Sequence, residues 1–521
     1  MRKGATRVVT AVSLSRLAGL IRERIFAQYL GTSAAADAFG AAFRIPMLLE
    51  QVLGDRVFSS AFIPRYSRLL AEGAGAQAAR LARTVAAIHV LIVTGIVVAG
   101  VLLAPLLVAA IAPGFDAATA DLTVRLVRIL FPTAGLLVLG SWCLGVLNSH
   151  RQFFLPYIVP VLSAAATSAG LLLAGRESGT PQIAEAAAWG ALVGALLQVL
   201  AQLPLVVRVM EPPAPRSEGV RADLQAVGSN ALPAAARGLL SRLGTWIEVA
   251  IAGFVSTGAI AALNYAQLLY SLPAGLFTVA ISAALLPEIS SASAQPGTLA
   301  HRLAGPLDSA LSHTAYLLIG SAVAFIALGD VLVAAVYLGG RFGTEDVNYV
   351  WAILGASSIG IVGASMGGLH ATAFYAIGDA RTPFKAAVIR LAVRAVLGVV
   401  LAIPVVRILG IDPKWGAAGL GAAIGISGWI EFLFLRRWLR DRIALPATPG
   451  FVPYLIRLWA IAAIAAAVAW LVKLALPTGQ PIARAAAVLG TYGVVYVGLT
   501  LAARMREPLS FLAQLRDVLR R

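Results

Sequence analysis

The amino-acid sequence predicts an all-α polytopic membrane protein with fourteen transmembrane helices. Two observations predict this class. Hydrophobic residues make up 59% of the chain and charged residues only 12%, a composition far outside that of soluble globular proteins. In addition, apolar stretches of roughly 20 residues, the length that spans a bilayer as a helix, recur along the chain and are separated by short polar breaks.

The predicted helices follow these stretches in order. Their ranges are 8–30, 36–64, 84–112, 122–147, 153–174, 184–208, 228–255, 258–286, 307–337, 347–375, 384–406, 416–439, 451–474 and 484–504. The first helix carries several arginines and no small-residue cleavage site, so we interpret it as a retained helix rather than a signal peptide.

The net charge of +17 is unevenly distributed between alternate loops. One set of loops contains the basic N-terminus, DARTPFK at 379–385 and RRWLRDR at 436–442, whereas the other contains the acidic stretches PGFDAATAD and FGTEDVN. Lys and Arg accumulate in cytoplasmic loops. We therefore expect both termini in the cytoplasm, which requires an even number of spans, and we do not expect nucleic acid as a partner.

The sequence contains no recognisable set of catalytic groups. Cys143 is the only cysteine, which excludes an internal disulfide and a cysteine metal site. The five histidines show no ligand spacing, and there is no phosphate loop, zinc signature or nucleophile elbow. We therefore expect no catalytic residues, metal or cofactor, and a transporter rather than an enzyme.

The two halves of the chain resemble each other. SRL at 15–17 matches SRL at 241–243, and Pro156 matches Pro383 at nearly the same offset. Two parallel six-helix repeats explain this match, because an even number of spans returns the second half to the side on which the first began. A chance similarity between Ala-, Gly- and Leu-rich helices is the alternative.

The repeat predicts four segments. They are an N-lobe at 1–211 with helices 1–6, a cytoplasmic linker at 212–222, a C-lobe at 223–443 with helices 7–12, and a segment at 444–521 with helices 13 and 14 and a basic tail. In transporters built from such repeats the substrate site lies between the halves near mid-membrane. We therefore expect a central cavity.

Charged residues are concentrated in the first two predicted helices. They are Arg16, Arg22, Glu23, Arg24, Asp37, Arg44 and Glu50. A charge at the bilayer centre costs about 2.5–3.5 kcal/mol on insertion scales, so these groups must line water, pair with one another or reach the membrane surface. Arg24 suits an interfacial or paired position. The other three arginines suit a hydrated cavity in which Asp37 can pair with one of them.

Such an arginine cluster predicts a phosphorylated, anionic cargo, because the guanidinium fork binds phosphoryl oxygens bidentately. The second half is poorer in charge and offers Arg242, Glu248, Arg390 and Arg394. The two last arginines stand at i and i+4 on one helix face. For Glu248 a structural ion pair is the favoured interpretation, and a coupling role through a proton or cation is the alternative.

Several motifs carry a family resemblance along the chain. They are SRLAGLIRERIFAQYLGTSAAADAFGAAFRIP, FSSAFIPRYSRLL, GVLNSHRQFFLPYIVPVL, LLPEISS and FYAIGDARTPFKAAV. In order and spacing the sequence resembles the lipid II flippase family MurJ (MviN), within the multidrug/oligosaccharidyl-lipid/polysaccharide (MOP) exporter superfamily. The resemblance implies two lobes around a cavity, a groove on helices 13 and 14 for the polyprenyl tail, and export of lipid II across the bacterial cytoplasmic membrane. Membrane lipids and cell-wall synthesis proteins would be further partners.

The resemblance also assigns residues. Arg16, Arg22, Asp37 and Arg44 match charged cavity positions that would bind substrate, and Arg22 with Glu23 matches the family's pair of an arginine and an acid. Further cavity or gating candidates are Glu23, Glu50, Asp55, Arg56 and Arg242.

Some positions depart from the family pattern. Glu50-Gln51 stands where many members have arginine, and Leu268 and Ser271 stand where some have an arginine and a glutamate. In some relatives helices 7 and 11 bind sodium, but here Arg394 replaces an expected oxygen ligand, and like charges repel strongly at low dielectric. We predict that Glu248 pairs with Arg390 or Arg394 and that no sodium site is present.

Two other functions stay open at this stage. The chain could export a different polyprenyl-diphosphate oligosaccharide, or it could be a membrane scaffold that retains the fold without transporting. The departures at Glu50 and Leu268 are the features that favour these alternatives.

Overall fold

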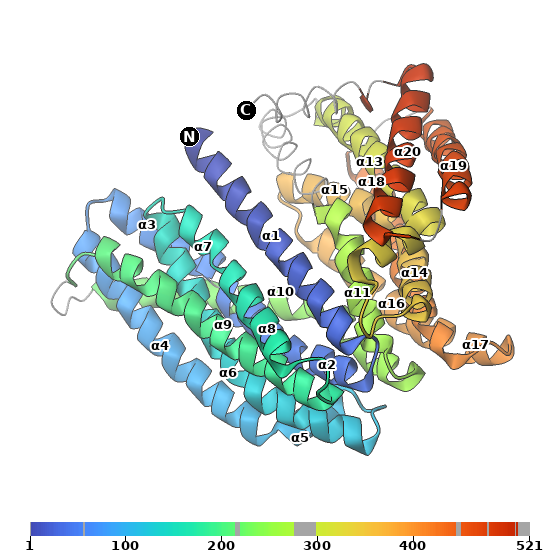
Figure 1. The fold of residues 1–521 in the computed structure, drawn as a ribbon. Helices are drawn as coiled ribbons and strands as arrows, with labels where there is room; N and C mark the ends of the chain where they lie inside the picture. The colour runs from blue at the N-terminus through green and yellow to red at the C-terminus, as the bar shows by residue number, and fades with distance from the viewer. Residues whose placement is uncertain are drawn as a thin grey trace. The chain divides into compact units, whose positions relative to one another are not determined.

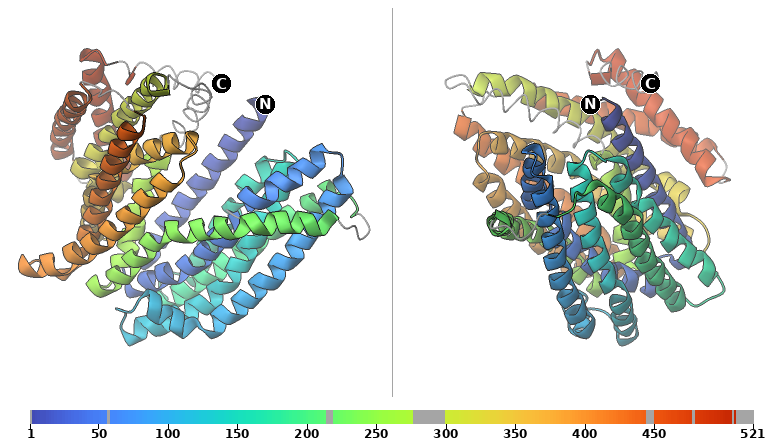
Figure 2. Two further views of the ribbon diagram at one scale, coloured as in Figure 1. Left: turned by 180° about the vertical axis from the view of Figure 1, so that it is seen from behind. Right: turned by 90° about the vertical axis from the view of Figure 1, so that its left-hand side faces the viewer.

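The computed structural model describes residues 2–55, 58–213, 219–275, 299–443, 450–476, 479–505 and 507–508. Helices account for nearly all of the regular structure, as Figures 1 and 2 show. Apart from an isolated bridge between Gly339 and Phe342, no β structure occurs in these ranges. The chain divides into two compact units: unit 1 is Met1–Ala261 with Gly339–Phe342, and unit 2 is Ala262–Leu338 with Gly343–Arg521.

Unit 1 begins with the long helix α1. Its elements are α1 (Arg2–Leu30), α2 (Ala34–Leu49), η1 (Glu50–Asp55), η2 (Phe58–Phe62), α3 (Ile63–Ala71), α4 (Gly75–Leu102), α5 (Ala104–Ile111), α6 (Ala117–Ser149), α7 (Phe154–Ile158), α8 (Pro160–Ala174), α9 (Thr180–Val209) and α10 (Gly219–Val255). Side-chain caps start two of the helices: Ser33 Oγ accepts from Ala36 N at 3.3 Å, and Asp116 Oδ1 accepts from Thr119 N at 3.0 Å.

Unit 2 contains the remaining helices. They are α11 (Ala259–Pro273), whose first residues belong to unit 1, α13 (Leu299–Tyr337), α14 (Thr344–Ser358), α15 (Ile361–Ala376), α16 (Arg381–Ala402), α17 (Pro404–Ile408), η4 (Pro413–Trp415), α18 (Gly416–Ile443), α19 (Phe451–Ala475) and α20 (Pro481–Ala502). Prolines at the first turns of α17 and α20 suit the N-terminal position, where a helix needs no proline N–H.

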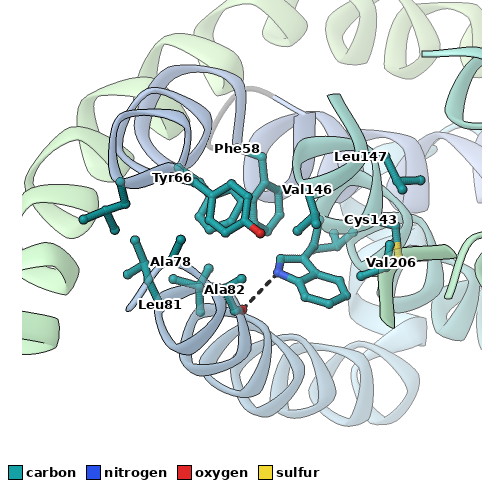
Figure 3. Packing of buried hydrophobic residues seen from close by; sticks show 14 of the residues in the cluster. Phe58, Tyr66, Ala78, Leu81, Ala82, Cys143, Val146, Leu147 and Val206 are labelled. Carbon is teal, nitrogen blue, oxygen red and sulfur yellow. Dashed lines mark hydrogen bonds between the residues drawn. The ribbon is translucent and has the colours of Figure 1, made fainter. Parts of the chain in front are cut away.

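The core of unit 1 lies where η2, α3, α4, α6 and α9 meet. Phe58, Tyr66, Cys143 and Val206 are buried together there (Figure 3). Trp142 Nε1 donates to the carbonyl of Ala82 at 3.0 Å, the dashed line in Figure 3. This bond satisfies the indole N–H, which would be costly to bury without a partner.

The all-α membrane class predicted from composition is confirmed. Within the described residues, nine helices are long and apolar enough to cross a membrane, or up to ten if the bent pair α14 and α15 counts as one span. Several predicted spans are broken into shorter helices: 36–64, for example, comprises α2, η1, η2 and part of α3. The number fourteen, the two-repeat layout and the central cavity stay predictions.

The helix α10 belongs to unit 1 by its contacts. The repeat places the same residues at the start of the C-lobe, because the predicted linker ends at 222. Within the described residues α10 packs on η1, η2, α4 and α5. The predicted N-lobe and C-lobe therefore stay a prediction. They differ from the two compact units in where they place α10.

Candidate functional site

The predicted second span passes through two π-helical segments, η1 and η2. Such wide turns are rare and occur frequently at functional sites. Glu50 begins η1, and its Oε1 accepts from Ser141 Oγ on α6 at 3.3 Å. Gly54 lies against the same serine, since a Cβ at Gly54 would be 2.8 Å from Ser141 Oγ. The Asp55 side chain and the whole of Arg56, both gating candidates, lie outside the described residues.

The arginines predicted to bind substrate lie on α1 and α2. Arg16 is exposed, whereas Arg22 and Arg44 are half-buried. Arg22 Nη2 pairs with Glu23 Oε1, the pair that the family resemblance implies. Arg44 Nη1 donates to the carbonyl of Thr245 on α10 at 3.4 Å. The carboxylate of Glu23 therefore offsets the positive charge of Arg22 locally.

Asp37 has a different environment from the one expected. Its carboxylate is 2% exposed and accepts hydrogen bonds from Gly258 N at 2.6 Å and from Ala261 N at 2.8 Å. Its hydrogen-bond partners within the described residues are therefore backbone N–H groups, and the expected pairing with an arginine is wrong. The carboxylate caps the first turn of α11, where unsatisfied N–H groups and the helix dipole attract an anion.

The loops around Asp37 approach each other at main-chain distance. Gly258 has φ +86°, and a Cβ there would lie 2.2 Å from Thr32 O. Gly31 has φ +56°, and a Cβ there would lie 2.7 Å from Arg341 O. Only glycine adopts these angles without strain and allows such an approach.

Arg341 belongs to the tight turn that Gly339 and Phe342 close, and it was not among the predicted site residues. Its backbone N–H donates to Gln28 O at 2.8 Å, and its Nη2 donates to Arg176 O at 3.1 Å and to Ser178 O at 3.0 Å. We call Gly31, Asp37, Gly258 and Gly339–Phe342 the hairpin end of unit 1.

An ion pair between a half-buried arginine and a buried aspartate holds the first turns of α10. Asp223, which is 1% exposed, accepts from Arg65 Nε on α3 at 2.7 Å and from Gln77 Nε2 on α4 at 2.8 Å. We call Arg65, Gln77 and Asp223 the Asp223 end. Nearby on α3, the Tyr66 hydroxyl lies 2.9 Å from His150 Nε2. Asp223 was not predicted from the sequence, because it lies in a polar stretch that resembles a linker.

In unit 2 an ion pair joins α16 and α18. Arg390 Nη1 donates to Glu431 Oε2 at 2.7 Å, and Glu431 keeps only 13% of its side chain exposed. Arg390 was a predicted candidate, but its acid partner was not. Arg242 and Arg394 are half-buried and Glu248 is buried. The predicted pairing of Glu248 stays a prediction, because Glu248 and the two arginines lie in different units.

Two positions that depart from the family pattern interact with each other. Ser271 Oγ donates to the carbonyl of Leu268 at 2.8 Å, so its hydroxyl is satisfied within α11. The described residues contain no group of three or more His, Cys, Asp or Glu side chains that could hold a metal ion.

Comparison with protein families gives one match over most of the chain. A family model described as "Lipid II flippase MurJ" matches residues 26–486. A Burkholderia cenocepacia protein named "Lipid II flippase MurJ" is 31% identical over 460 residues, which cover 85% of each chain. A Rhizobium tropici protein named "Probable lipid II flippase MurJ" is 30% identical over 426 residues, which cover 80% of this chain and 76% of that protein.

Solved structures share the fold. A structure described as "Lipid II flippase MurJ, inward closed conformation" aligns with a TM-score of 0.76 at 22% identity, over 96% of this chain and 99% of that chain. An inward-facing multidrug resistance MATE family transporter of the MOP superfamily aligns with a TM-score of 0.67 at 16% identity, over 84% of this chain and 98% of that chain. At these identities the two structures support the fold alone.

Proposed function

The chain belongs to the lipid II flippase MurJ family, and from this membership we propose that it carries lipid II from the inner to the outer leaflet by alternating access. It is a multi-pass membrane transporter and not an enzyme, and its substrate is lipid II. The family match over residues 26–486 carries this conclusion. The family's function implies the bacterial inner membrane, and the basic loops support cytoplasmic termini.

The first step is capture of the lipid headgroup by the arginines of α1 and α2. Arg16, Arg22 and Arg44 are the side chains that would bind its diphosphate, because guanidinium groups stay charged at any relevant pH and bind phosphoryl oxygens bidentately. Arg16 is exposed and Arg22 is half-buried. The pairing of Arg22 with Glu23 supports a role in which phosphate competes with the carboxylate for the guanidinium group.

In the second step the bound headgroup loses access to the cytoplasm and gains access to the outside. Contacts near one end of α10 form while those near the other end break. If the lobes part at the predicted linker, α10 and the start of α11 must separate from the first helices at one end at a time. The predicted topology makes the hairpin end the outer closure and the Asp223 end the inner one. Opening outward would then break the bonds from Gly258 and Ala261 to Asp37, and opening inward would break the pair of Arg65 with Asp223.

Membrane potential supplies a direction for this exchange. Moving a negative charge from the negative interior to the outside is favoured by about 2.3 kcal/mol per charge per 100 mV. A diphosphate headgroup would therefore be driven outward without nucleotide hydrolysis.

A second candidate is export of another polyprenyl-diphosphate oligosaccharide. It is favoured by the replacement of the family's charged residues at Glu50, Leu268 and Ser271, which would alter contacts to the sugar and peptide. The diphosphate and the polyprenyl tail are common to both cargoes, so the same arginines would serve either one.

Complementation separates these functions. Cells depleted of their own lipid II flippase should grow with the wild-type chain and should stop growing with Arg22→Ala at equal expression. Arg68→Ala is the matched control, because Arg68 pairs with Glu72 on the exposed surface of α3 and its removal should leave growth unchanged. Failure of the wild type to restore growth, with the protein present in the membrane, would reject lipid II as the cargo.

A further inference from the structure

One candidate span of unit 2 is broken in its middle. The helices α14 and α15 are together long and apolar enough for a single span, but they are bent by 41° at a break that contains Ile359 and Gly360. Both helices pack on α13 and on α18. A break in a spanning helix frees backbone groups that lipid cannot satisfy, so neighbouring residues must supply their partners.

The sequence before the break explains why the helix bends there. Ser357 and Ser358 are both buried. Ser357 Oγ donates to the carbonyl of Ile353 at 2.8 Å, four residues earlier. Ser358 Oγ donates in the same way to the carbonyl of Leu354 at 2.6 Å. Serines bonded like this bend helices, and sharp kinks occur at glycine and serine pairs. The two serines and Gly360 therefore place the bend at one point of the span.

A tryptophan of α18 binds the carbonyl at the break. In a continuous helix the carbonyl of Ile359 would accept from the backbone N–H of Gly363, four residues later. Here α15 begins only at Ile361, and Trp429 Nε1 donates to the Ile359 carbonyl at 2.7 Å. The indole also covers Gly363, where a Cβ would lie 2.7 Å from the ring. The carbonyl of Ile359 therefore has two possible donors, the indole and the backbone of α15.

Glycines allow α18 to approach both halves of the broken span. A Cβ at Gly360 would overlap Gly425 Cα, and a Cβ at Gly421 would lie 2.8 Å from the carbonyl oxygen of Ile353. Backbone thus faces backbone at the break and in α14 before it. The bond from Trp429 adds a side-chain contact to this packing at the break itself.

We propose that Ile359 and Gly360 form a two-state hinge and that Trp429 is the positioning residue that holds its bent state. In the bent state the Ile359 carbonyl accepts from the indole N–H. In the straighter state it accepts from the backbone N–H of Gly363, and the indole releases it. One hydrogen bond replaces another, so the two states differ little in energy. The hinge changes the angle between α14 and α15 as access alternates, and in this respect the inference rests on the proposed function.

Spin labels on the two helices measure the angle of the hinge. Glu345→Cys on α14 and Tyr375→Cys on α15 place the labels at exposed positions, whereas the native Cys143 is fully buried. Straightening a bend of 41° lengthens the separation of the two labelled positions by about 3 Å. In full-length protein in nanodiscs, Trp429→Phe should cause this lengthening, because it keeps a ring and removes the N–H that holds the bent state.

Trp351→Phe is the matched control for Trp429→Phe. Trp351 Nε1 also donates to backbone carbonyls, those of Phe325 and Ile326 at 3.1 Å each, but these lie inside the single helix α13. Helical N–H groups already satisfy such carbonyls. Removal of this indole N–H should therefore leave the label separation at the wild-type value.

A second variant keeps the test decisive if Trp429→Phe fails to fold. Ser357→Ala combined with Ser358→Ala removes the two bonds that favour the bend and keeps Trp429. Both hydroxyls donate within their own helix, so their removal leaves no donor without an acceptor. The label separation should again increase.

Transport is the second readout. The movement of fluorescent lipid II between leaflets is followed in proteoliposomes that contain the full-length chain. A cycle that needs both hinge states slows when one state is depleted, so Trp429→Phe should lower the rate about fivefold. Affinity for lipid II should stay within about twofold of the wild type, because the headgroup candidates lie on α1 and α2. Trp351→Phe should change neither the rate nor the affinity.

The outcomes separate this inference from the proposed function. The hinge is overturned if the label separation is the same in the wild type, Trp429→Phe and the serine variant, or if Trp351→Phe changes it equally. A longer separation with an unchanged transport rate overturns the role of the hinge in transport. A wild type that does not move lipid II rejects the proposed function, and the label separations alone then decide whether the hinge exists. A longer separation with slower transport supports both.

Discussion

Within unit 1, different chemistry holds the hairpin end, where Gly258 follows α10 in the chain, and the Asp223 end, where α10 begins. At the hairpin end the bonds are largely to the main chain: Asp37 accepts from the N–H groups of Gly258 and Ala261, and Arg341 donates to the carbonyls of Gln28, Arg176 and Ser178. At the Asp223 end the contacts join side chains, with Arg65 and Gln77 on one carboxylate. Both ends bury an aspartate almost completely.

This difference decides how each end can open. At the hairpin end the backbones approach at glycine distance, and Asp37 and Arg341 each bond to two main-chain groups at once, so these contacts are lost together when a loop moves. Side-chain contacts on Asp223 can be exchanged one at a time by changes of rotamer. We therefore expect the hairpin end to open in a single step and to tolerate substitution poorly, and the Asp223 end to be more adaptable. The following variants test this comparison.

Gly258→Ala should have the largest effect. An alanine at φ +86° is strained, and its Cβ would lie 2.2 Å from Thr32 O, so we expect a loss of about 3 kcal/mol in unfolding free energy. Cys143 is the only cysteine and is fully buried. Its reaction with a thiol-specific fluorophore during heating therefore measures unfolding of unit 1.

Gly73→Ala is the matched control for Gly258→Ala. Gly73 has φ +75°, but a Cβ at this position would meet no atom within 4 Å, so only the backbone strain of about 1 kcal/mol applies. Equal shifts of the melting temperature in Gly258→Ala and Gly73→Ala would mean that the close approach of Gly258 to Thr32 does not add to the destabilisation caused by backbone strain.

Asp37→Ala should follow, with a loss of about 2 kcal/mol, because two buried N–H groups would lose their acceptor. Asp37→Asn keeps one acceptor oxygen and should retain about half of that stability. The same thermal assay on Cys143 measures both. If the two variants unfold at the wild-type temperature, the carboxylate does not hold α11.

Asp223→Asn should have a smaller effect than Asp37→Ala. Arg65 keeps 29% of its side chain exposed, so solvent screens the pair and the expected loss is about 1 kcal/mol. Glu72→Gln, which breaks the exposed pair with Arg68, is the control and should shift the melting temperature little. A loss at Asp223 greater than that at Asp37 would reverse the comparison between the two ends.

Composition and motif order were enough to predict the membrane class and the family. Local patterns also placed one helix end: the predicted first span ends at residue 30, as α1 does. The pair of Arg22 with Glu23 was expected because the two residues match the family's pair of an arginine and an acid. These features depend on residues that are close together along the chain.

The partners of distant residues could not be predicted. Asp37 bonds to backbone N–H groups more than two hundred positions away, and since every residue except proline carries an N–H, nothing in the sequence marks those donors. Glu431, Asp223 and Arg341 were missed for a related reason. Each is an ordinary charged residue near a polar stretch or inside a helix, and its importance comes only from the element that packs against it.

The smallest expected effect concerns pH at the Asp223 end. Burial lowers the pKa of His150 below its usual 6.5, so the native state binds this proton more weakly than the unfolded state does. As pH falls below about 6.5, the unfolded state takes up the proton first, and the stability contributed by neutral His150 is lost. We expect the wild type to lose more stability between pH 7.5 and pH 5.5 than His150→Gln does, as measured by the thermal assay at each pH. If the stability of the wild type and of His150→Gln fell in parallel with pH, the contact of Tyr66 with His150 would not depend on the protonation of the ring. The adaptability of the Asp223 end would then come from Arg65 and Gln77 alone.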